Sequence, residues 1–159
     1  MAKIGVIRSE MCNKKELLCD SMDWFSYDWV LEQLNKDVDI QGIDRIGFTD
    51  DGYELFIVTD DFLLSDIPHF HYRKKEKGKP CEFHTCIRID KPEYYFHTGN
   101  EMLLNSKQKE KLLKFLKTEY HSKKYSCTYW ERLIMSWNHQ NDYVICVEED
   151  SPMPDYRKL

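Results

Sequence analysis

Residues 68–90 read PHFHYRKKEKGKPCEFHTCIRID, and this stretch decides the kind of fold that the chain adopts. Two runs rich in aromatic and β-branched side chains, 69–72 and 82–89, flank a segment of lysine, glycine and proline. Such a pattern is typical of antiparallel strands joined by a loop. A third run at 94–97 follows a turn at 90–93, so we expect a three-stranded meander.

The alternation of side chains along a strand sorts the meander into two faces. One face carries mainly apolar groups: Phe70, Tyr72, Phe83, Thr85, Ile87, Ile89, Tyr94 and Phe96. A first loop centred on residues 76 and 77 would place His69 opposite His84, and His71 opposite Glu82. The second turn would place Cys86 opposite His97. The other face then gathers the polar candidates: His69, His71, Glu82, His84, Cys86, Arg88 and His97.

This polar face has the donor groups of a metal site. Imidazole nitrogen and thiolate sulfur are good ligands for zinc and other transition metals. We therefore predict that one transition-metal ion, such as zinc, can be held by His69, His71, Cys86 and His97. In a small metal-dependent hydrolase or nuclease, Glu82 or His84 would be the general base that activates a metal-bound water.

Two other interpretations of the same face need no metal. The side chains of His69, His71, His84, Arg88 and His97 can form a binding surface for a macromolecular partner. Alternatively, they are the solvent-facing polar side of an ordinary antiparallel sheet, whose other side packs on the core.

The remaining segments supply a hairpin and helices. Residues 44–49 and 53–59 flank an Asp-Gly turn, which predicts a hairpin with Phe48 opposite Leu55 and with Glu54 facing outward. Helical spacing and capping signals predict helices within 13–35, after Asn105 or Ser106, and after the capping box formed by Thr128 and Glu131. A last strand is expected at 143–147.

These elements predict the α+β class for a chain of 159 residues, which is the size of one domain. We expect a single domain at 1–150 with a largely antiparallel sheet of about five to six strands, and three or so helices packed on one of its faces. The acidic and then proline-rich residues 151–159 are expected to form an exposed tail.

Charge and cysteine content indicate which partners and which cellular compartment to expect. The net charge is −5, but residues 71–124 hold 14 Lys and Arg against 7 Asp and Glu. This basic segment allows an acidic or nucleic-acid partner. Its lysines at 107–117 are also typical of the solvent-exposed face of a helix. Six cysteines without a Cys-x-x-Cys pair favour reduced thiols, and the sequence shows no signal peptide or membrane span. We expect a cytoplasmic protein without a membrane partner.

The sequence also resembles a known family. The motif Pro68-His69-Phe70-His71, the two strands after it, a helix and then Trp137-Asn138 occur in the same order as in an uncharacterised family of small bacterial domains with a Pro-His-Phe-His strand motif. The resemblance covers about residues 66–141. That family is associated with toxin–antitoxin-like and mobile-element gene neighbourhoods. The resemblance implies a bacterial or phage accessory protein, of the toxin–antitoxin, immunity or defence type, that binds a macromolecular partner.

Overall fold

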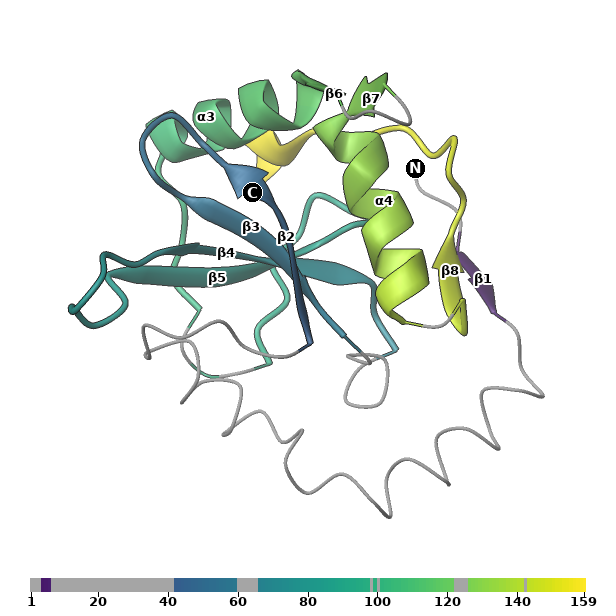
Figure 1. The fold of residues 1–159 in the computed structure, drawn as a ribbon, viewed down its shortest axis with the longest axis horizontal. Coiled ribbons are helices and arrows are strands. Elements are labelled where there is room, and N and C mark those ends of the chain that lie inside the picture. Colours follow the sequence, from purple (N-terminus) through teal and green to yellow (C-terminus); the bar gives the residue numbers. More distant parts are fainter. Residues whose placement is uncertain are drawn as a thin grey trace, which may run out of the picture.

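The computed structural model describes residues 4–6, 42–59, 66–97, 99, 101–121, 126–141 and 143–159. Its centre is a four-stranded antiparallel sheet in which neighbours in sequence are neighbours in space, in the order β2-β3-β4-β5 (Figure 1). The four strands are β2 (Ile43–Phe48), β3 (Glu54–Val58), β4 (His69–Lys74) and β5 (Phe83–Arg88). The predicted hairpin and the first two strands of the meander are therefore confirmed.

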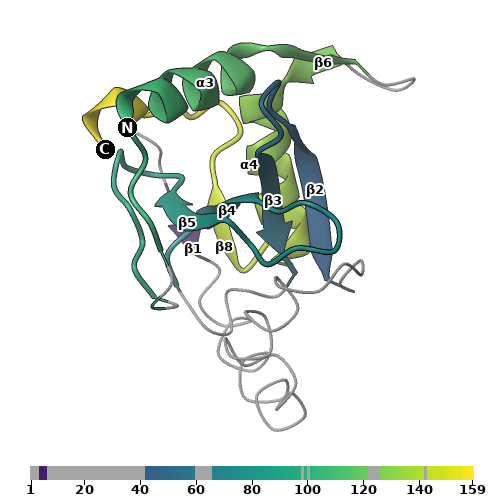
Figure 2. The ribbon, with the colours of Figure 1, turned by 90° about the vertical axis from the view of Figure 1, so that its left-hand side faces the viewer.

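Two helices cover one face of this sheet: α3 (Ser106–Lys117) and α4 (Tyr129–Gln140). Both begin at capping boxes, in which the Asn105 and Thr128 side chains accept hydrogen bonds from backbone N–H groups in the first turn. Seen from the side, α3 lies above the sheet and α4 runs alongside it (Figure 2). The α+β class and the starts of both helices are as the sequence predicts.

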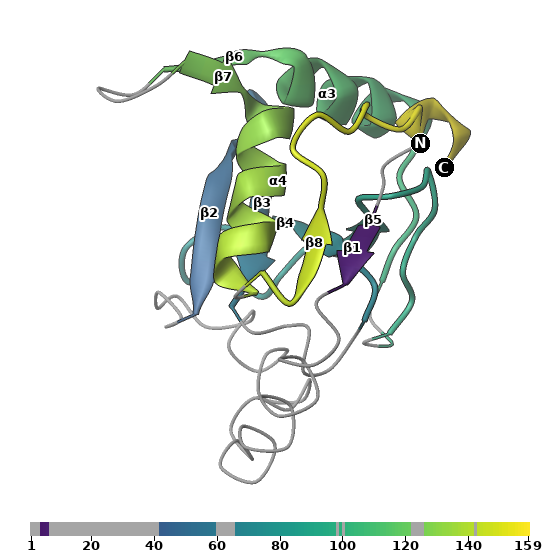
Figure 3. The same cartoon turned by 90° about the vertical axis from the view of Figure 1, so that its right-hand side faces the viewer.

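The other strands form two separate pairs. β1 (Ile4–Val6) pairs with β8 (Ile145–Val147), and β6 (Glu119–His121) pairs with β7 (Ser126–Thr128). Figure 3 shows β8 and β1 beside α4, on the side away from β2. Within the described residues, a single sheet of five to six strands is not confirmed, and the helix expected within 13–35 lies outside them.

The third strand of the meander is reduced to a bridge. Ile87 pairs with Tyr94, the Tyr95 N–H donates to the Cys86 carbonyl at 2.9 Å, and the Met102 N–H donates to the His84 carbonyl at 2.8 Å. The segment after β5 thus runs along the free edge of that strand. This arrangement protects an edge that would otherwise expose unpaired backbone groups.

A continuous apolar core fills the space between the sheet and its helices. Fully buried side chains from both layers contact one another there, among them Leu55, Ile57, Phe70, Tyr72, Ile87, Leu112, Leu116, Leu133, Ile134 and Trp137. Burying one such side chain contributes about 1.5–3 kcal/mol. This face is the apolar face that the alternation predicts, except that Phe96 is 61% exposed.

The prediction of an exposed tail at 151–159 is wrong. Tyr156, in the short 3₁₀ helix η3 (Tyr156–Lys158), is fully buried, and its hydroxyl donates to the Arg88 carbonyl at 2.7 Å. The Trp130 ring N–H donates to the Ser151 carbonyl at 2.9 Å. The buried Tyr156 ring, together with Met153 and Leu159, packs this proline-containing segment against the core.

The register expected for the β2–β3 hairpin is also wrong. Phe48 lies opposite Glu54 rather than Leu55, because the Thr49 N–H donates to the Tyr53 carbonyl and closes a turn of three residues, 50–52, instead of two. A shift of one residue exchanges the faces. Phe48 is therefore 59% exposed, whereas Glu54 is buried and accepts hydrogen bonds from Arg73 at 2.8 Å and from Arg45 at 2.6 Å.

Candidate metal centre

The register of β4 and β5 brings the predicted ligands together by a different pairing from the one expected. His71 lies opposite Cys86, and His69 lies opposite Arg88, so the expected pairs of His69 with His84 and of His71 with Glu82 are wrong. The actual loop is displaced toward the C-terminus by an even number of positions. An even displacement leaves every side chain on its expected face.

Four side chains converge on this face. His69 and His71 come from β4, Cys86 from β5, and His97 from the segment that follows β5. One ligand atom from each residue can be chosen so that all four atoms lie within 4.8 Å of one another. These four residues, named here the metal-ligand cluster, are the four that the sequence predicts.

The closest contacts have the lengths of a coordination polyhedron. His71 Nδ1 lies 3.3 Å from Cys86 Sγ and 3.0 Å from His84 Nε2. Cys86 Sγ and His84 Nε2 are 3.7 Å apart. With Zn–N near 2.0 Å and Zn–S near 2.3 Å, a tetrahedral site separates its ligand atoms by roughly 3.3–3.7 Å. Of these contacts, the one between His71 Nδ1 and Cys86 Sγ joins two members of the cluster, and its length fits such a site.

Backbone carbonyls orient two of the imidazole rings. His69 Nδ1 lies 2.8 Å from the Ile67 carbonyl, and His97 Nδ1 lies 2.9 Å from the Tyr95 carbonyl. A carbonyl oxygen only accepts, so each Nδ1 carries the proton and the Nε2 lone pair is left as the metal-binding atom. Metal-bound histidines in proteins are usually held by this same kind of hydrogen bond.

The metal-ligand cluster is closed off from solvent. His69, His71 and Cys86 are fully buried, and the His97 side chain is 7% exposed. Aromatic rings line it: Phe56 stacks on His71 at 4.9 Å between ring centroids, and Tyr95 stacks on His97 at 4.2 Å. Rings packed this tightly restrict the imidazole rotamers and exclude bulk water.

Two further polar groups border the cluster. Burial, and then the neighbouring His71, lower the pKa of His84 to about 3, so His84 is neutral at physiological pH. The Glu101 side chain, 1% exposed, accepts the backbone N–H groups of His97 and Gly99 and has Oε1 3.6 Å from His97 Nδ1. Glu101 thereby holds the turn that carries His97. Sequence reasoning missed it, and its spacing four residues after His97 was the available signal.

Two predicted site residues do not join the cluster. Glu82 is exposed at the loop end of β5, four positions before Cys86 on the strand. Arg88 has Nε and Nη2 bound to the two oxygens of Asp90, at 2.8 and 2.7 Å. Glu82 is thus not placed to be the general base, and Arg88 supports the end of β5 through its own ion pair.

The interpretation of the histidine face as the solvent-facing side of an ordinary sheet is wrong, whereas the binding of a partner stays a prediction. His69 and His71 have no exposed surface, so neither ring can contact a macromolecular partner in this structure. Alternation along a strand predicts which residues share a face, but burial depends on what folds over that face. Here the segment carrying His97 and Glu101 folds over it.

Comparison of the chain with protein-family models, with curated proteins and with solved structures gave no match. The resemblance to the family with the Pro-His-Phe-His strand motif therefore stays a prediction. Among the described residues, no helix combines the length and the hydrophobicity needed to span a bilayer.

Proposed function

We propose that the chain binds one transition-metal ion through His69, His71, Cys86 and His97, and that Zn²⁺ is the ion that fits best. The observation that carries this proposal is the convergence of three imidazoles and one thiol within 4.8 Å in a buried site. Zinc commonly takes tetrahedral sites made of imidazole nitrogen and thiolate sulfur. Magnesium and calcium prefer oxygen ligands, which the cluster does not offer.

The role proposed for the ion is structural. Four protein ligands complete a tetrahedron, whereas a catalytic zinc site usually keeps one position open for water or substrate. The ion would link the paired strands β4 and β5 to the segment after β5, which few backbone hydrogen bonds join to β5. Metal-binding free energy then adds directly to folding free energy.

We further propose that the metal-stabilised domain is a non-enzymatic binding module of a bacterial or phage accessory protein. A closed donor set leaves no place for a substrate at the ion, and Glu82 lies away from it. Both features favour partner binding over the alternative of a metal-dependent hydrolase or nuclease. The surface that contacts the partner would then lie outside the metal-ligand cluster.

Elemental analysis of untagged protein tests the metal site. We expect about one equivalent of zinc in the wild type. The metal should be lost in His69→Ala/His71→Ala and retained in the matched control His121→Ala/His139→Ala, whose histidines lie outside the cluster. A wild-type protein without metal after growth in zinc-supplemented medium would rule the site out.

If the histidine variant does not fold, substitution of the metal by cobalt tests the metal site instead. Co²⁺ bound to the wild type should show thiolate charge-transfer absorption, and Cys86→Ser should remove it while Cys146→Ser should not. The structural role is tested separately by nuclease and hydrolase assays. Turnover by the zinc-loaded protein that disappears in Cys86→Ser would overturn that role in favour of catalysis.

A further inference from the structure

The C-terminal end of α3 separates two recesses in the surface, far along the chain from the metal-ligand cluster. A recess of about 550 Å³ lies between α3 and the C-terminal segment, and its lining includes Lys117, Met153 and Arg157. A second recess of about 290 Å³ lies between α3, the β2–β3 turn and the start of α4. Lys114 and Thr118 line both, so the two recesses lie on either side of the end of the helix.

The smaller recess has an apolar floor. Phe115 and Tyr129 contact each other there with ring centroids 4.3 Å apart. A Cβ atom on Gly47 would lie 2.9 Å from Phe115 and 3.0 Å from Tyr129, so both rings pack directly on the bare backbone of β2. The pairing of Phe48 with Glu54 next to the turn leaves Phe48 at the rim of this recess, 59% exposed. An apolar side chain of a partner would find rings on two sides of this recess.

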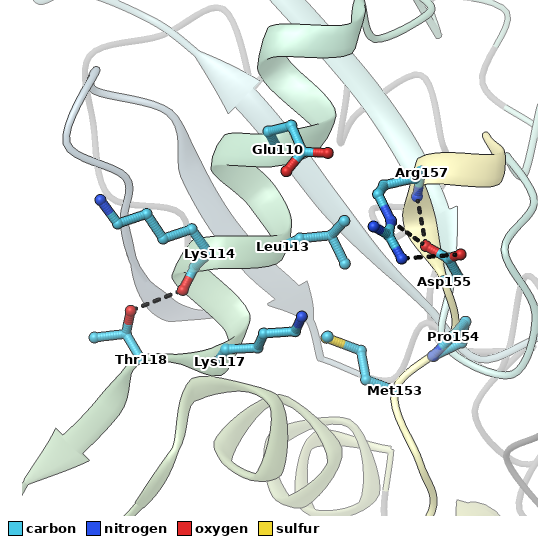
Figure 4. Close-up of a pocket in the computed structure, with 9 residues that line it drawn as sticks. All are labelled: Glu110, Leu113, Lys114, Lys117, Thr118, Met153, Pro154, Asp155 and Arg157. Atoms are coloured by element: carbon cyan, nitrogen blue, oxygen red, sulfur yellow. Dashed lines mark hydrogen bonds and ion pairs between the residues drawn. The ribbon is translucent and has the colours of Figure 1, made fainter.

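The ridge between the recesses carries two lysines that form no ion pair with the described residues. Lys114 and Lys117 are exposed in the last turn of α3, and in the described part of the chain no ion pair engages either ammonium. Their neighbours differ: Lys111 binds Asp50 at 2.7 Å, and Arg157 binds Asp155 at 2.9 Å. Figure 4 shows Lys117 reaching across the larger recess toward Met153 while Lys114 turns to the other side.

We propose that these two recesses form one docking surface for an acidic peptide segment of a partner protein. One apolar side chain of the segment would enter the smaller recess between Phe48 and Tyr129, and two carboxylates further along the same side of the segment would pair with Lys114 and Lys117. Same-side residues of an extended peptide are about 6–7 Å apart, which suits two lysines one helical turn apart. This inference rests on the proposed role as a binding module but not on the metal ion.

The charge distribution favours a peptide over a nucleic acid. Asp50, Glu110 and Asp155 also line the recesses, and the whole chain carries a net charge of −5. A phosphate backbone has closely spaced charges that would meet these carboxylates, and its binding relies on many cations. A peptide with a few carboxylates and an apolar side chain fits two free ammonium groups beside an apolar floor.

Fluorescence anisotropy with a defined probe tests the proposal. The probe is a short fluorescein-labelled peptide with one phenylalanine and two glutamates at alternate positions, so that their side chains share one side, and the same peptide with glutamine in place of glutamate is its control. We expect micromolar affinity for the wild type, at least about tenfold weaker binding by Lys114→Glu/Lys117→Glu, and weaker binding by Phe48→Ser. The matched control Lys77→Glu/Lys107→Glu makes the same change in net charge elsewhere and should bind as the wild type does.

Each other outcome overturns the proposal. Equal loss of affinity in both double variants would mean general charge attraction, and equal binding of the glutamine peptide would mean that the lysines are not used. Tighter binding of a single-stranded DNA oligonucleotide would make the surface a nucleic-acid interface. Self-association of the protein in sedimentation velocity that Lys114→Glu/Lys117→Glu abolishes would make a second copy the occupant. The metal content of every variant, measured alongside, reports on the proposed metal site separately.

Discussion

The two faces of the central sheet are buried to a similar depth by different chemistry. The face under α3 and α4 is aliphatic and aromatic, and its burial is favourable without any partner group. The opposite face buries Glu54, His69, His71, Arg73 and His84, whose polar atoms lose water and must find partners. The comparison teaches that one face holds the fold together by packing alone, while the other depends on ion pairs and, in our proposal, on a metal ion.

Within the polar face, the buried polar groups are partnered in two different ways. Glu54 is held by two arginines, at 2.6 and 2.8 Å, and Arg73 also lies over the Phe56 ring at 5.0 Å. The histidines instead face one another and Cys86, in an arrangement that a cation can bridge. Removing groups from the two faces should therefore give stability losses that respond differently to chelators.

The largest effect is expected from a cavity in the apolar face. Leu133 in α4 is fully buried, and Leu133→Ala should lower the free energy of unfolding by about 4 kcal/mol through lost transfer energy and the cavity. Urea unfolding with and without a chelator measures this. The loss should be the same in both conditions, and bound metal should be unchanged. A folded Leu133→Ala protein that has lost its metal would show that the two faces are not independent.

Metal removal should have the next largest effect. With free zinc about 100-fold above its dissociation constant, chelation should lower the free energy of unfolding by about 3 kcal/mol. Hydrogen exchange can locate the change, because the amides of Tyr95 and Met102 donate to β5 beside the cluster and should exchange faster. The amide of Asn141, which donates to Trp137 at the end of α4, serves as the control. Equal acceleration at all three amides would contradict a local role for the ion.

A smaller effect is expected from the buried ion pair. Glu54→Gln keeps the size of the side chain but removes the charge that faces Arg73 and Arg45, and should cost about 2 kcal/mol. Glu76→Gln makes the same change in the exposed pair with Lys79 and should leave unfolding unchanged within error. Thermal unfolding of both variants at matched zinc measures the difference. Equal stability of the two variants would mean that burial adds nothing to the ion pair.

Much of the candidate site follows from local sequence rules. Alternation places His69, His71, Cys86 and His97 on one face whatever the loop length, provided that the error in register is even. The capping boxes at Asn105 and Thr128 likewise act within one helical turn, so the starts of α3 and α4 are readable from adjacent residues. These features depend on backbone geometry and on side chains a few positions apart.

Other features required contacts between distant segments. Three features each depend on loop geometry or on packing against remote elements: the pairing of His71 with Cys86, the turn register that exposes Phe48 and the burial of Tyr156. Sequence by itself determined which donors share a face, because side-chain periodicity is local. Only the tertiary structure decided that this face is closed rather than wet and that Glu101 supports it, because burial is a property of whatever folds over a strand.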